Sequence, residues 1–161
     1  MRVFVAGASG GLGSRLIPML VAAGHDVTGV TRSPSKADAL RRAGANPMVV
    51  DALDAGALRE AVLNARPEVV VHEMTALGNA SDLRHFDRAF AQTNRLRTEG
   101  LDHLLAAARE SGARRVWRRA IAAGRSPASG VGSRPKTTLW IRRRRGNSSA
   151  RSRLSVTSKT P

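Results

Sequence analysis

Apolar residues along the first 113 positions of this 161-residue chain follow two alternating patterns. Short runs of strand length are each followed by a longer stretch in which apolar residues recur every three or four positions, as on one face of a helix. Gly, Pro or Asp separates the two kinds of segment, as expected at turns. This alternation predicts βαβ units and a parallel sheet. The strand-like runs are residues 3–6, 27–30, 48–50 and 69–72.

Helical patterns follow the strand-like runs. The first contains Pro18 deeper than its first turn, which predicts a kink. The last is the longest, and we expect one long helix that ends at Gly112. The apolar residues of the four faces are Leu12, Leu16, Ile17 and Leu20; Ala37 and Leu40; Leu58, Ala61, Val62 and Ala65; and Leu83, Phe86, Phe90, Leu101, Leu104, Leu105 and Ala108.

These elements predict an α/β fold, a doubly wound parallel sheet of the Rossmann type with strand order 3-2-1-4-5. A fifth strand begins near Arg114 and then fails, because Arg118 and Arg119 stand where a buried strand should continue. We therefore expect a truncated sheet in residues 1–115 and a disordered basic tail in residues 116–161. Ligands of such sheets bind at the switch point between strands 1 and 4.

Four glycines lie within seven residues between the first strand and the first helix. Gly7, Gly10 and Gly13 give the spacing G-x-x-G-x-x-G, and Gly7, Gly11 and Gly13 give G-x-x-x-G-x-G. Glycines in a strand–turn–helix unit permit a tight turn, close approach of backbone N–H groups to phosphates, and close helix packing. The helix N-terminus adds a positive dipole end. A pyrophosphate site is favoured over a ligand-free connection, and its predicted residues are Gly7, Ser9, Gly10, Gly11, Leu12 and Gly13.

Both spacings resemble the short-chain dehydrogenase/reductase superfamily, and the first is similar to its extended branch, the NAD-dependent epimerase/dehydratase family. The resemblance covers residues 1–115 and implies a domain that binds NAD(P). It also implies oxidoreduction, epimerisation or dehydration of a nucleotide-sugar-like or small carbonyl substrate. Asn94, followed by Gly100 and the run Leu-Leu-Ala-Ala-Ala, resembles the family's fourth-helix motif. The resemblance implies that Asn94 supports a catalytic tyrosine, and a polar residue on a helix flank is the open alternative.

The end of the second strand bears on the choice of cofactor. Arg32, flanked by Thr31 and Ser33, lies about twenty residues beyond the glycine turn, where the ribose 2′ group is read. An acidic residue there would bind the 2′-hydroxyl of NAD, whereas Arg32 suits the 2′-phosphate of NADP. We therefore favour NADP over NAD. A solvated arginine, or one that stacks on adenine and tolerates NAD, remains open.

Two further segments are implied as cofactor contacts by the resemblance. Asp51 and Ala52 close the third strand and would contact the adenine, with a helix cap as the equal alternative for Asp51. Thr75 and Ala76 follow the fourth strand and would pass beside the ribose and the nicotinamide.

The catalytic pair of the family is missing. Hydride transfer there needs Tyr-x-x-x-Lys, in which the phenol acts as acid or base, and this chain has no tyrosine. The serine or threonine expected after the fifth strand falls at Arg118 and Arg119. His72 and Glu73 are adjacent and point to opposite faces of a strand, so they are no metal pair. We assign no catalytic residue and no metal ligand, and we expect weak NADPH binding without turnover.

The balance of basic and acidic residues changes abruptly near Gly112. Residues 1–113 hold 13 Lys/Arg against 12 Asp/Glu, whereas residues 114–161 hold 14 Lys/Arg and no acidic residue. Three interpretations are open. The tail is a frame-shifted translation of a GC-rich gene, whose product lacks its catalytic half; or it is an arm that binds nucleic acid by neutralising phosphates; or it is a solvated terminus without a partner. The first is favoured, because acidic residues vanish abruptly inside a recognisable strand.

Composition excludes other classes. The chain has no cysteine, which excludes disulfides and thiolate metal sites and fits a reducing compartment. No stretch approaches the apolar length of a membrane span, and the N-terminus is a strand rather than a signal peptide. We expect a cytoplasmic protein that does not bind a membrane. The substrate and the oligomeric state are not predicted.

Overall fold

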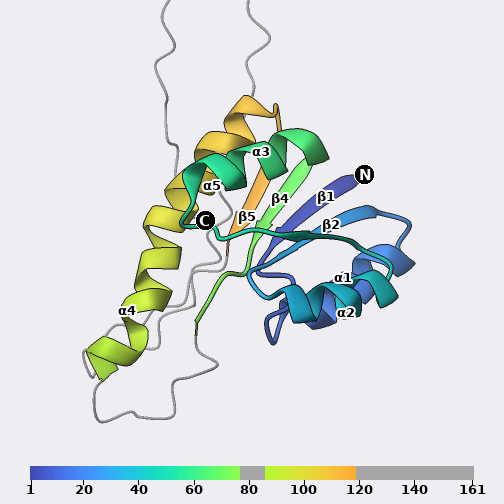
Figure 1. Cartoon of the computed structure of the whole chain (residues 1–161). Helices are drawn as coiled ribbons and strands as arrows, with labels where there is room; N and C mark the ends of the chain where they lie inside the picture. The colour runs from blue at the N-terminus through green and yellow to red at the C-terminus, as the bar shows by residue number, and fades with distance from the viewer. Residues whose placement is uncertain (77–85, 119–161) are drawn as a thin grey trace, which may run out of the picture.

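Five parallel strands form the centre of the molecule in the computed structural model, which describes residues 1–76 and 86–118 (Figure 1). The strand order is β3-β2-β1-β4-β5, which confirms the predicted order. All four pairings are parallel, and β1 pairs with β2 on one side and β4 on the other. The strands are β1 (Arg2–Ala6), β2 (Asp26–Thr31), β3 (Asn46–Val49), β4 (Val69–His72) and β5 (Arg115–Arg118).

Helices cover both faces of this sheet (Figure 1). Val3 and Val5 of β1 pack toward α1 and α2, and Phe4 between them packs toward α3 and α5, because successive side chains of a strand alternate. Burial on both faces explains the nearly continuous apolar runs. The helices are α1 (Gly13–Ala22), the short 3-10 turn η1 (Pro34–Lys36), α2 (Ala37–Arg42), α3 (Ala55–Ala65), α4 (Phe86–Arg97) and α5 (Glu99–Glu110).

The fourth helical pattern is divided between two helices, so the prediction of one long helix is wrong. α4 and α5 meet at Thr98, whose ψ of −83° leaves the helical region. The Thr98 hydroxyl donates to the carbonyl of Asn94 at 2.9 Å, a local hydrogen bond that competes with a regular helix. Leu83, which belonged to the predicted pattern, lies outside the described residues.

Two details at other elements differ from the sequence prediction. Leu12 precedes α1 and is 41% exposed, so it does not share the buried face with Ile17. β5 includes Arg118, which pairs with His72, although we expected the strand to fail there. An arginine is tolerated at this position because it is exposed on an edge strand of the described sheet.

Asp54, rather than Asp51, caps a helix. The Asp54 carboxylate accepts from the backbone N–H of Ala57 at 3.0 Å at the start of α3. The Asp51 carboxylate instead accepts from the N–H of Leu53 at 3.0 Å in the turn before it. The helix-cap alternative for Asp51 is therefore wrong.

We expect Asp54→Ala to lower the free energy of unfolding by about 1 kcal/mol, the usual cost of losing an N-cap. Urea denaturation followed by circular dichroism measures it. Asp51→Ala serves as the control and should cost less, because its hydrogen bond lies outside the helix. A larger loss in Asp51→Ala than in Asp54→Ala would contradict the assignment of the cap.

Candidate functional site

The turn between β1 and α1 is held by two glycines that no other residue can replace without movement. Gly7 has a φ of +88°, and a Cβ there would lie 2.6 Å from the carbonyl oxygen of Glu73. A Cβ on Gly13 would lie 2.3 Å from the carbonyl oxygen of Gly7. The N–H of Gly10 donates to that same carbonyl at 3.1 Å and closes the turn. The loop, β1 and the segment after β4 are thus packed backbone against backbone.

The start of α1 offers free hydrogen-bond donors. Among the residues that the structure describes, none accepts from the backbone N–H groups of Gly11, Leu12 or Gly13. No side chain caps this helix, and its first turn contains no acidic residue. A Cβ on Gly11 would meet no described atom within 4 Å, so a ligand can approach the backbone closely there. Unpaired donors at a helix N-terminus fit a phosphate group.

The carboxyl end of β2 lies beside this loop. Thr31 is 3% exposed, and its hydroxyl lies 2.7 Å from that of Ser9, while the N–H of Ser33 donates to Thr31 Oγ1 at 3.1 Å. Thr31 therefore joins the glycine loop to the end of β2. Arg32 and Lys36 are exposed, and neither has an ion-pair partner within the described ranges.

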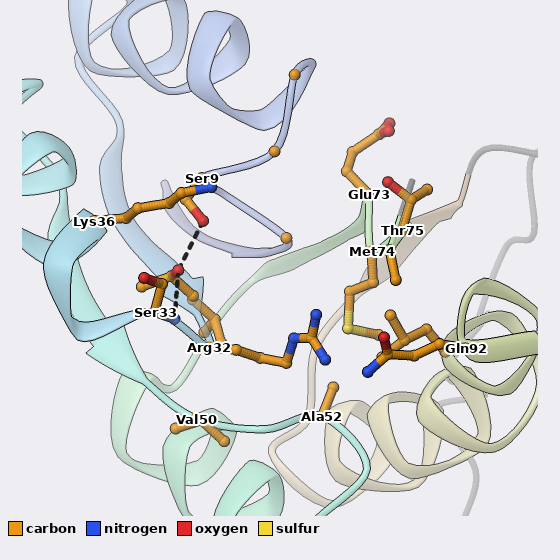
Figure 2. A pocket seen from close by; sticks show the side chains of 17 residues that line it. Ser9, Arg32, Ser33, Lys36, Val50, Ala52, Glu73, Met74, Thr75 and Gln92 are labelled. Atoms are coloured by element: carbon orange, nitrogen blue, oxygen red, sulfur yellow. Dashed lines mark hydrogen bonds between the residues drawn. The ribbon is translucent and has the colours of Figure 1, made fainter. Parts of the chain in front are cut away.

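A cavity of about 550 Å³ lies at the carboxyl ends of the strands (Figure 2). It is bordered by the glycine loop, the ends of β2 and β4, the segment after β3, and α4. Such a crevice is where ligands bind open α/β sheets. Nine of the thirteen predicted site residues line it: Gly7, Ser9, Gly10, Gly11, Thr31, Arg32, Ala52, Thr75 and Ala76.

The other four predicted residues do not line the cavity. Leu12 is the N-cap residue of α1 and Gly13 is its first residue, and their backbone N–H groups are among the unpaired donors at this helix end. The Asp51 carboxylate is engaged with Leu53, as described above. Asn94 is exposed on α4, and its backbone carbonyl accepts from the N–H of Thr98 at 3.0 Å.

Eight lining residues were not predicted from the sequence. Lys36 follows Arg32 by four residues, and this second cation was a usable signal. Gln92 and Leu96 of α4 share a helix face at the spacing i, i+4, but nothing in the sequence places that face at the cavity. The complete set is Val30, Ser33, Lys36, Val50, Glu73, Met74, Gln92 and Leu96.

Two hydrogen bonds tie α4 to the segment at β4. His72 is 4% exposed, and its Nε2 lies 3.2 Å from the carbonyl oxygen of Leu96. The hydroxyl of Thr93, which is 1% exposed, accepts from the N–H of Ala76 at 3.0 Å. These bonds hold the α4 wall of the cavity against Thr75 and Ala76. His72 ends β4 and lies in the core, whereas the next residue, Glu73, lines the cavity.

Burial lowers the pKa of His72 below its ordinary value of 6.5. Between the two values the unfolded chain binds more protons than the folded one, so stability rises with pH there and falls as pH drops. We expect the free energy of unfolding to fall below about pH 6.5, by up to about 1.4 kcal/mol per pH unit. His72→Gln, which keeps a side-chain donor but does not titrate, should flatten this slope.

Urea denaturation between about pH 5 and pH 7 measures the His72 effect separately from the carboxyl groups. The backbone N–H of Arg2 lowers the pKa of Glu68, and the hydrogen bond from Arg59 lowers the pKa of Glu110. The contributions of these two carboxylates to the free energy of unfolding are complete above the ordinary carboxyl pKa of 4.5 and are lost only at lower pH. An equal slope in wild type and His72→Gln would contradict the role given to His72.

Similarity to known proteins agrees with this geometry. A sequence model of the NAD(P)H-binding family matches residues 7–146, starting at the first glycine of the loop. The chain belongs to the NAD(P)H-binding family. The cavity of this NAD(P)H-binding protein has the place, the glycine loop and the free donors that a dinucleotide requires.

Individual relatives extend the resemblance. The chain is 49% identical over 127 residues to a 3-diazoavenalumate denitrifying reductase from a Streptomyces species, covering 79% of this chain and 40% of the reductase. WbmG of Bordetella bronchiseptica, solved with NAD and UDP, is 28% identical with a TM-score of 0.59 over 73% of this chain and 37% of WbmG. The UDP-glucose 4-epimerase of Thermus thermophilus, solved with NAD, is 25% identical with a TM-score of 0.61 over 72% and 36%.

These matches confirm the resemblance of the N-terminal portion to NAD-dependent epimerases and to the superfamily that contains them. The chain spans less than half the length of each of the three relatives. Within residues 1–76 and 86–118, no helix is long and apolar enough to cross a membrane, and no three metal-ligating side chains gather. The predicted basic tail lies outside the described residues beyond Arg118, and nucleic-acid binding stays the untested alternative.

Proposed function

We propose that the chain is the cofactor-binding part of an NADP(H)-dependent reductase. One observation carries the proposal: a single cavity joins the glycine loop to Arg32 and Lys36 at the end of β2. The loop supplies donors for a pyrophosphate, and the two cations supply a site for a further phosphate. NADP differs from NAD by that phosphate, on the ribose 2′ position.

The residues that would hold each part of the dinucleotide follow from their places around the cavity. The N–H groups at the start of α1 would bind the pyrophosphate. Arg32 and Lys36 would bind the 2′-phosphate, and Val50 and Ala52, in the segment after β3, would contact the adenine. Thr75 and Ala76 would border the nicotinamide half. The dinucleotide, when bound, supplies hydride chemistry, whereas these residues bind and orient it.

Charge supports NADP rather than NAD as the cofactor. An acidic residue that would accept from a ribose 2′-hydroxyl is absent at the end of β2, where Thr31, Arg32 and Ser33 stand. Neither Arg32 nor Lys36 has an ion pair elsewhere in the described part of the chain, so both are available for a phosphate. Charge-assisted hydrogen bonds from arginine to phosphate are among the strongest in proteins.

Reduction is the reaction class supported by the more similar relative. The Streptomyces reductase shares 49% identity with the chain, against 28% for WbmG. We propose that a small organic substrate receives the hydride, as in a reductase. Because the chain has no tyrosine, the Tyr-x-x-x-Lys pair of the resembled family is absent from it. The expected property of this chain is therefore cofactor binding without turnover.

Isothermal titration of the intact chain with NADPH and with NADH tests the proposal. We expect NADPH to bind at least about tenfold more tightly, since a charge-assisted hydrogen bond contributes about 1.5 kcal/mol or more. Incubation with NADPH and small carbonyl compounds should leave the absorbance of NADPH unchanged. Binding of neither dinucleotide, or tighter binding of NADH, would contradict the proposal.

A further inference from the structure

Glu73 is fixed in place beside the glycine loop. It is the first residue after β4, and its backbone N–H donates to the carbonyl of Ala6 at 2.9 Å. Its own carbonyl lies so close to Gly7 that a Cβ there would be 2.6 Å away. The backbone of Glu73 therefore cannot shift without moving the turn that forms the floor of the cavity.

Opposite charges lie at opposite sides of this cavity. The ionisable residues among its lining are Arg32, Lys36 and Glu73. The two cations come from the end of β2 and from η1, whereas Glu73 comes from the end of β4, on the other side of β1 in the sheet. Figure 2 shows Glu73 beside Thr75 and away from Ser33 and Lys36. The cavity is thus positively charged at the end of β2 and negatively charged at the end of β4, and a dinucleotide would cross from one to the other.

The Glu73 side chain is partly buried, and its carboxylate makes no hydrogen bond or ion pair among the residues that the structure describes. A carboxylate beside a loop that binds phosphates is unfavourable unless something else offsets the repulsion. A positive group of the ligand near Glu73 would offset this repulsion.

Only one part of a nicotinamide dinucleotide is positive, and only in one redox state. The phosphates are anionic in both states, whereas the nicotinamide ring is a cation when oxidised and neutral when reduced. With the adenosine end on Arg32 and Lys36 and the pyrophosphate on the glycine loop, the nicotinamide half extends over the end of β4. Glu73, Thr75 and Ala76 lie there.

We propose that Glu73 is a specificity-determining residue that makes the site bind the oxidised dinucleotide in preference to the reduced one. The proposal rests on the proposed function, because it takes the dinucleotide as the ligand. It adds a redox preference that the glycine loop and the two cations cannot supply, since phosphate contacts are the same in both states. Glu73 acts here through charge alone and exchanges no proton with the ligand.

Titration of the intact chain with NADP⁺ and with NADPH, in wild type and in Glu73→Gln, tests the proposal. Glutamine keeps the size of the side chain and removes its charge. We expect Glu73→Gln to weaken NADP⁺ binding about threefold to tenfold and to leave NADPH binding equal or tighter, as a screened charge pair predicts. The ratio of the two affinities is the readout, and a general loss of structure would not move it.

Three companion measurements keep the result decisive. Glu73→Asp, which retains the charge, should retain most of the wild-type ratio. Glu60→Gln, on the exposed side of α3 and outside the cavity lining, should leave the ratio unchanged. In wild type, raising the salt concentration to about 1 M should lower the preference for NADP⁺ over NADPH, because screening shortens to about 3 Å. This last measurement stands even where Glu73→Gln does not fold.

Each other outcome overturns the proposal in a recognisable way. Equal changes for NADP⁺ and NADPH in Glu73→Gln would show that the carboxylate acts on the phosphates. An unchanged ratio in Glu73→Gln, or a ratio insensitive to salt, would show that its charge does not reach the ring. If wild type binds neither dinucleotide, the proposed function fails together with this inference. If wild type binds both and the ratio is unmoved, only the inference fails.

Discussion

Gly13→Ala is expected to destabilise the chain more than an alanine at either Gly10 or Gly11 of the same loop. The new Cβ would lie 2.3 Å from the carbonyl oxygen of Gly7 and 2.7 Å from the Cα of Ala8. Both neighbours are backbone atoms, so the clash cannot be relieved by a rotamer change, and α1 must move away from β1. We expect the free energy of unfolding to fall by about 3 kcal/mol, the upper end for an overpacked site. Urea denaturation measures it.

Gly11→Ala is the matched control for this prediction. It adds the same methyl group two residues earlier in the same loop, where no described atom lies within 4 Å and φ is not positive. Its free energy of unfolding should stay within about 0.5 kcal/mol of wild type. If the two variants lose equal stability, close packing at Gly13 is not what holds the turn.

Arg32→Ala is expected to remove the preference for NADPH. Loss of a charge-assisted hydrogen bond to the 2′-phosphate costs about 1.5 to 3 kcal/mol, which corresponds to a loss of affinity of about tenfold to a hundredfold. NADH lacks this phosphate, so its affinity should change little. Titration of both dinucleotides into wild type and variant gives the selectivity directly.

Arg42→Ala is the control for Arg32→Ala. Arg42 is an exposed arginine in the last turn of α2 and does not line the cavity, so its loss changes net charge by the same amount without touching the site. Its affinities for NADPH and NADH should match those of wild type. An equal loss of NADPH and NADH affinity in Arg32→Ala would mean that Arg32 binds the part that the two cofactors share.

The strand order and the place of the cavity could be predicted from the sequence because local signals carry them. Gly7, Gly10 and Gly13 stand between a strand-length apolar run and a helical pattern. This order of strand, glycine turn and helix is typical of the first unit of a dinucleotide-binding sheet. Arg32 could be placed because the end of β2 must lie beside the end of β1 in a parallel pair.

Features that depend on packing between distant segments could not be predicted. The division of α4 from α5 lies at Thr98, where ψ is −83°, and a helical apolar pattern does not reveal such a local change of the backbone. Gln92 reaches the cavity because Thr93 and Leu96 bond to groups near β4, which are far away in sequence. Asp51 and Asp54 are equal candidates for a helix cap by residue type, and only the path of the chain distinguishes them.

A titration of the ¹⁵N-labelled chain with NADPH, followed through its backbone amide resonances, tests most directly whether the cavity is the dinucleotide site. The chain of 161 residues and 17.1 kDa is small enough for each amide to be observed. We expect the largest shifts at Gly11, Leu12 and Gly13, with further shifts at Arg32 and in residues 73–76. Residues 59–60 on the outside of α3 should remain unchanged. Shifts absent from the glycine loop, or concentrated elsewhere, would contradict the assignment of the site.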